Sequence, residues 1–192
     1  MCRILSVLSV LAAGLVAGLS TLALGQGVAQ AQDLGASATP YDPDLLVLGA
    51  GGYNILHDKE NAAVFRGEFR FGNEAFYYIR PLLGVEANTD GGFYGYGGFG
   101  FNLPLADAGI STPFFDHLVL FPSAAVGYWQ RGGSKNLGSH AEFRTGAELD
   151  YRFDDASRLG VSFHHLSNAG ISNHNPGVEE LMIEYALPFS HL

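Results

Sequence analysis

Apolar and polar residues alternate with a period of two along most of the chain after residue 32. In the run "HAEFRTGAELDYRF", residues 140–153, apolar and small side chains hold the odd positions, and charged side chains hold most even positions. The run "AAVFRGEFRFG", residues 62–72, shows the same separation. Such alternation predicts β-strands whose two faces meet different surroundings. No later segment has a convincing helical period, and none is apolar over the length of a spanning helix.

Eight segments follow this pattern and are separated by polar or glycine-containing turns. The predicted strands cover residues 45–55, 62–72, 75–86, 92–102, 117–130, 138–152, 158–167 and 179–189. The connection 103–116 is longer than the other turns, and the sequence offers no reason for its length.

Two architectures explain strands of this kind. A soluble sandwich would turn the apolar face inward, whereas an outer-membrane barrel would turn it toward lipid and the charges toward the lumen. The segments are about as long as tilted spanning strands, and the polar face carries charges of both signs. Aromatic residues near the strand ends are typical of membrane girdles: Tyr77, Tyr78, Tyr94, Tyr96, Tyr128 and Trp129. We therefore predict an all-β protein, an eight-stranded antiparallel transmembrane β-barrel whose lumen is filled by side chains.

The N-terminal region differs from the rest of the chain. One base, Arg3, precedes a long apolar run that ends in small residues at Ala29-Gln30-Ala31. This predicts a signal peptide over residues 1–31, cleaved before Gln32, and a barrel domain over residues 32–192. An uncleaved membrane helix is the alternative reading, because the apolar run is long for a signal core.

Charge and cysteine content exclude some functions. The chain has nineteen acidic and ten basic residues, and this net charge of −9 argues against nucleic acid as a partner. The only cysteine, Cys2, lies before the apolar run, so the predicted barrel has neither a disulfide nor thiolate chemistry available.

Three polar residues interrupt the apolar face in the segment "HHLSNAGISNHNPGVEE", residues 164–180. His165 and Ser167 continue the face that begins with Leu159, Val161 and Phe163. Glu179 continues the face of the last strand, which carries Leu181, Ile183, Tyr185, Leu187 and Phe189. Residues i and i+2 of a strand share one face, and a directly opposed residue lies about 4.5–5.5 Å away on the next strand. We therefore expect the three side chains to emerge together on the outside of the barrel.

A hydroxyl, an imidazole and a carboxylate in this order form a nucleophile, a base and an orienting acid. Ser167 needs His165 to remove its proton, and Glu179 would hold the imidazole tautomer. The side chain of Asn168 or nearby backbone N–H groups would stabilise the oxyanion. The alternative is that these polar residues merely mark the membrane boundary.

The stretch "HLSNAGISNHNPGVE", residues 165–179, resembles the signature of the PagL-type lipid A 3-O-deacylases. In that family His-x-Ser-Asn-Ala-Gly is followed by a short loop and a Glu. The resemblance implies that His165 is the base, Ser167 the nucleophile and Glu179 the orienting acid. It also implies that Asn168 serves the oxyanion, whereas Asn175 and Gly177 shape the loop.

These observations predict an outer-membrane serine esterase of a Gram-negative cell that removes the 3-O-linked acyl chain of lipid A without cofactor or metal. Its partners would be lipopolysaccharide and outer-membrane lipid. An outer-membrane phospholipase using the same residues, and a non-catalytic structural or adhesive barrel, are the alternatives. A homodimer or loop closure would be ways to hold such an activity back, and no residue argues for either.

Overall fold

The structure of the protein, a computed structural model, describes residues 43–57, 59–72, 79–109 and 112–189. The predicted signal peptide and the aromatic residues Tyr77 and Tyr78 lie outside the described residues. Within them the elements are β1 (Asp44–Tyr53), β2 (Ala62–Arg70), β3 (Ile79–Asn88), β4 (Phe93–Phe101), β5 (Leu103–Pro104), η2 (Leu105–Ala108), η3 (Phe115–His117), β6 (Leu118–Gln130), β7 (Ala141–Arg152), β8 (Arg158–Ser167) and β9 (Val178–Phe189).

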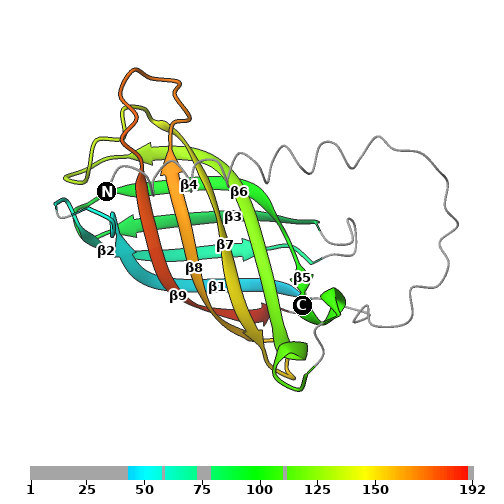
Figure 1. Ribbon diagram of the computed structural model, residues 1–192. Coiled ribbons are helices and arrows are strands. Elements are labelled where there is room, and N and C mark those ends of the chain that lie inside the picture. The colour runs from blue at the N-terminus through cyan, green and yellow to red at the C-terminus, as the bar shows by residue number, and fades with distance from the viewer. Residues whose placement is uncertain (1–42, 58, 73–78, 110–111, 190–192) are drawn as a thin grey trace, which may run out of the picture. The chain divides into compact units, whose positions relative to one another are not determined.

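The eight long strands close on themselves as an antiparallel barrel (Figure 1). Each pairs with its neighbours along the chain, β1 also pairs with β9, and β4 pairs with β6. Closure leaves no long strand with an unpaired edge, which a membrane barrel requires. Each long strand corresponds to one predicted segment, so the predicted fold class is confirmed.

The connections divide between the two ends of the barrel. Loops 54–61, 89–92, 131–140 and 168–177 lie at one end, which we call the site end. The connection between β4 and β6 lies at the other end, where the 3-10 helices are drawn in green (Figure 1). There the two residues of β5 pair with β6, and His117 stacks on Tyr151.

Apolar side chains cover the outside of the wall. Ile183 is 65% exposed and Leu83 is 57% exposed, and similar values recur at alternate positions on every long strand. Exposure of this extent on all sides is expected only where the surrounding solvent is lipid. Among the described residues, no helix is long and apolar enough to cross a bilayer.

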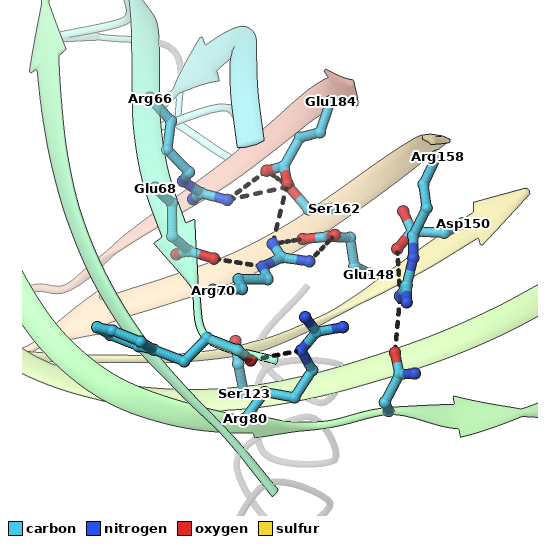
Figure 2. A network of polar contacts seen from close by, with 12 residues as sticks. Arg66, Glu68, Arg70, Arg80, Ser123, Glu148, Asp150, Arg158, Ser162 and Glu184 are labelled. Carbon is cyan, nitrogen blue, oxygen red and sulfur yellow. Dashed lines mark hydrogen bonds and ion pairs between the residues drawn. The ribbon is translucent and has the colours of Figure 1, made fainter. Parts of the chain in front are cut away.

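Charged side chains fill the lumen. The Arg70 guanidinium donates two hydrogen bonds of 2.7 Å to Glu148 and one of 2.6 Å to Glu68 (Figure 2). Arg144 bridges Glu68 and Glu86 at 2.8 Å each. All five residues are at most 3% exposed. Bidentate and shared pairs of this kind offset the cost of burying charge, so the lumen is a solid polar core without a pore.

The predicted aromatic girdle is wrong for three of its members. Tyr94, Tyr96 and Trp129 are at most 6% exposed and point into the lumen, whereas Tyr128 is 54% exposed on the outer wall. The Tyr96 hydroxyl donates to Glu68 at 2.7 Å, and the Trp129 ring stacks on Tyr53. The parity of β4 explains the burial of Tyr94 and Tyr96, because the even positions of this strand face the lumen, as the buried carboxylates do.

We expect Arg70→Met to destabilise the barrel by about 3–5 kcal/mol, because it leaves Glu68 and Glu148 buried with fewer cationic partners. Urea unfolding in detergent, followed by the fluorescence of Trp129, measures this change. The matched substitution Arg131→Met, in an exposed loop, should change stability by about 0.5 kcal/mol or less. Equal unfolding midpoints for the two variants would contradict this role of the lumen pairs.

Candidate active site

His165 and Glu179 face each other across β8 and β9 at the site end. The two residues are direct partners in the strand register, and His165 Nδ1 lies 3.2 Å from Glu179 Oε1. The imidazole is 43% exposed on the outer wall, and the Glu179 side chain is 11% exposed. An imidazole that gives Nδ1–H to a carboxylate keeps Nε2 as the acceptor.

Ser167 lies two residues beyond His165, on the same outer face and opposite Phe143 of β7. Its burial is intermediate, so its hydroxyl is accessible from outside the wall. Among the described residues, no hydrogen bond joins Ser167 to His165. Hydrogen bonds between catalytic groups are often long before substrate binds, so the lack of one here is compatible with Ser167 as the nucleophile and His165 as its base.

Gly177 shapes the other side of the imidazole. Its φ is +61°, in the left-handed region that favours glycine, and it directly precedes Val178 and Glu179. A Cβ at this position would lie 2.6 Å from His165 Cε1. The backbone of residue 177 therefore packs on the ring edge, and only glycine allows this approach.

Asn168 and Asn175 hold the loop between β8 and β9. The Asn168 side chain is fully buried, and its Nδ2 donates to the carbonyls of Leu137 at 2.8 Å and His174 at 2.9 Å. Its backbone N–H donates to Asn175 Oδ1 at 3.0 Å. Both Nδ2 hydrogens of Asn168 are therefore engaged within the fold. Among the described residues, the amide nitrogen of the exposed Asn175 makes no hydrogen bond, which leaves it available to a ligand.

Two loop residues that the sequence analysis missed contact Glu179 and Gly177. His57, in the loop after β1, has Nδ1 3.7 Å from Glu179 Oε2. Lys135, in the loop after β6, donates from Nζ to the carbonyl of Gly177 at 2.9 Å. Burial lowers the pKa of Lys135, while the carboxylates of Glu179 and Glu60 act in the opposite direction. Neither residue lies in a predicted strand, so the alternation of apolar and polar residues could not identify them.

A second serine–histidine pair lies inside the barrel. His164 is 1% exposed, and its Nε2 lies 3.2 Å from the hydroxyl of Ser123. Its Nδ1 faces Arg66 at 3.4 Å. Because the pair is enclosed by the lumen network, an ester in the membrane has no access to it. The outward set around His165 is the one that can meet a lipid.

Comparisons with known proteins bear on the fold and the family of this chain. The family model of PagL, lipid A 3-O-deacylase, matches residues 63–188. A crystal structure of the outer membrane enzyme PagL is 18% identical, with a TM-score of 0.57, and covers 76% of this chain and 99% of its own. A structure from the de novo design of transmembrane β-barrels is 14% identical, with a TM-score of 0.50, and covers 76% of this chain and 96% of its own. A comparison with curated proteins found no match.

The structural likenesses establish the barrel fold, and the family match spans β2 to β9 and includes His165, Ser167 and Glu179. The family match supports an outer-membrane location and hydrolase chemistry on lipopolysaccharide, as the sequence predicted. The chain belongs to the PagL family of lipid A 3-O-deacylases.

Proposed function

We propose that this protein hydrolyses the 3-O-linked acyl ester of lipid A in the outer membrane with Ser167, His165 and Glu179. The observation that carries the proposal is the 3.2 Å contact between His165 Nδ1 and Glu179 Oε1 on the lipid-facing wall. A polar pair on an otherwise apolar wall is costly to keep out of water, which favours a functional role.

The proposed reaction proceeds through an acyl-enzyme. Ser167 Oγ attacks the ester carbonyl carbon while His165 Nε2 takes the hydroxyl proton, and Glu179 stabilises the imidazolium. Collapse of the tetrahedral intermediate breaks the bond to the sugar oxygen, which leaves as the 3-hydroxyl with the proton from His165. Water then attacks the acyl-enzyme with His165 as base, and collapse of the second intermediate breaks the bond to Ser167 Oγ, which takes the proton from His165 as the fatty acid is released.

The oxyanion of that intermediate needs a donor placed in advance. Asn168 is the donor that the family resemblance implies, but its two Nδ2 hydrogens bind carbonyls of the fold, which supports a positioning role. Asn175 has its Oδ1 fixed by the backbone N–H of Asn168, so its Nδ2 is oriented away from that contact. We assign Asn175 Nδ2 to the oxyanion and Asn168 to holding the loop.

The position of the site fits a substrate that stays in the membrane. Val161 and Phe163 lie on the outer face of β8 directly before His165, and their side chains would contact an acyl chain. With the site end toward the outer leaflet, lipid A reaches Ser167 sideways without being extracted from the bilayer.

Mass spectrometry of lipid A from cells that make the protein tests the proposal. We expect loss of one 3-hydroxyacyl chain, and we expect Ser167→Ala to reduce this loss by several orders of magnitude because no nucleophile remains. His174→Ala, in the exposed loop, is the control and should retain activity. Accumulation of lysophospholipid would instead favour a phospholipase, and unchanged lipids would favour a non-catalytic barrel.

The deacylation rate should fall as the pH is lowered, because a histidine base must be neutral to accept the serine proton. Protonation of His165 removes the base, so kcat/KM should follow a single acidic limb when measured with purified protein and lipopolysaccharide. A rate that stays constant well below about pH 6 would argue against a histidine base.

Gly177→Ala should reduce kcat on the order of 10²-fold, because the added Cβ displaces the His165 ring. Gly91→Ala is the matched control, since Gly91 also has a positive φ, of +81°, but open space around its Cα. Both variants bear similar backbone strain, so comparable activities would show that contact with the ring does not matter.

A further inference from the structure

We infer that Lys135 is a positioning residue for the His165–Glu179 pair, because it holds the backbone of Gly177 beside the imidazole. The inference rests on the proposed function and concerns a residue from a different loop of the barrel. Lys135 touches neither Ser167 nor the expected acyl chain, so it would act through other residues.

The contacts of Lys135 join three loops at the site end. Its Nζ donates to the carbonyl of Gly177 at 2.9 Å and to Asn54 Oδ1 at 3.1 Å. Asn54 is fully buried, and its Nδ2 donates to the carbonyl of Lys59 at 2.7 Å, which closes the loop between β1 and β2. The backbone N–H of Ile55 donates to the carbonyl of Glu179 at 3.2 Å. The ammonium thus binds both segments that flank the carboxylate.

A displacement at Gly177 would reach both members of the pair. The glycine backbone packs against His165 Cε1, and the chain passes through a single residue, Val178, before Glu179. Loss of the hydrogen bond from Lys135 would free a carbonyl that otherwise fixes this left-handed position. Small displacements of catalytic groups have large effects on rate, so a contact outside the site can control it.

The charge of Lys135 is unusual for its environment. The side chain is 8% exposed, and a buried ammonium is costly unless acceptors and a negative charge compensate it. Two oxygens accept its hydrogen bonds, and Glu179 and Glu60 supply negative charge. His165 on β8 and His57 in the loop after β1 are the other titratable groups that face Glu179. A neutral donor would be enough if this side chain only joined the loops by hydrogen bonds.

The test uses the full chain, purified in detergent, with lipopolysaccharide as substrate. We expect Lys135→Met to lower kcat about tenfold or more with KM changed less than about twofold, because orientation rather than substrate binding is lost. Lys59→Met, at an exposed lysine of the neighbouring loop, should change neither quantity.

A second variant separates the charge from the hydrogen bond. Lys135→Gln keeps a donor, so we expect a smaller loss of kcat; it also carries the test if Lys135→Met fails to fold, as judged by Trp129 fluorescence. A Lys135→Met rate equal to that of Lys59→Met, or a rise in KM that accounts for the loss of rate, overturns the positioning role. A wild-type protein that leaves lipid A unchanged overturns the proposed function itself.

Discussion

Guanidinium–carboxylate pairs buried in the lumen are the interaction on which the rest of the structure depends. Arg70 and Arg144 each bind carboxylates from more than one strand, so a change in strand register would leave charges unpaired inside the wall. Such charges would cost several kcal/mol each. Because the polar residues occupy the interior, the apolar residues must face outward, and only lipid makes that exposure favourable.

The same constraint places the candidate site on the outer wall. His164 and His165 are neighbours in the chain, yet one contacts Ser123 in the lumen and the other contacts Glu179 outside. The inner histidine helps to lock β8 in register, and that register sets His165 opposite Glu179. The polar core therefore supports the candidate site indirectly, by fixing the two adjacent strands that carry His165 and Glu179.

The loops at the site end are held in place by hydrogen bonds to one another, which the strands alone do not supply. Asn168 binds the carbonyl of Leu137, and Lys135 binds the carbonyl of Gly177, so the loops after β6 and β8 hold each other in place. A lipid-facing site lacks the enclosing pocket of a soluble esterase. Mutual bonding of loops takes over part of that role by orienting donors before substrate arrives.

The sequence alone determined the eight strands and the common face of His165, Ser167 and Glu179, because side-chain parity within a strand is a local property with a period of two. It favoured the membrane barrel over a sandwich through the length of the strands and the charges of both signs on their polar face. It also carried the motif that relates the chain to its family. Only the tertiary structure decided that the Asn168 amide is engaged within the fold and that Lys135 binds the carbonyl of Gly177. These outcomes depend on barrel closure and on contacts between loops distant in the chain, which no local pattern encodes.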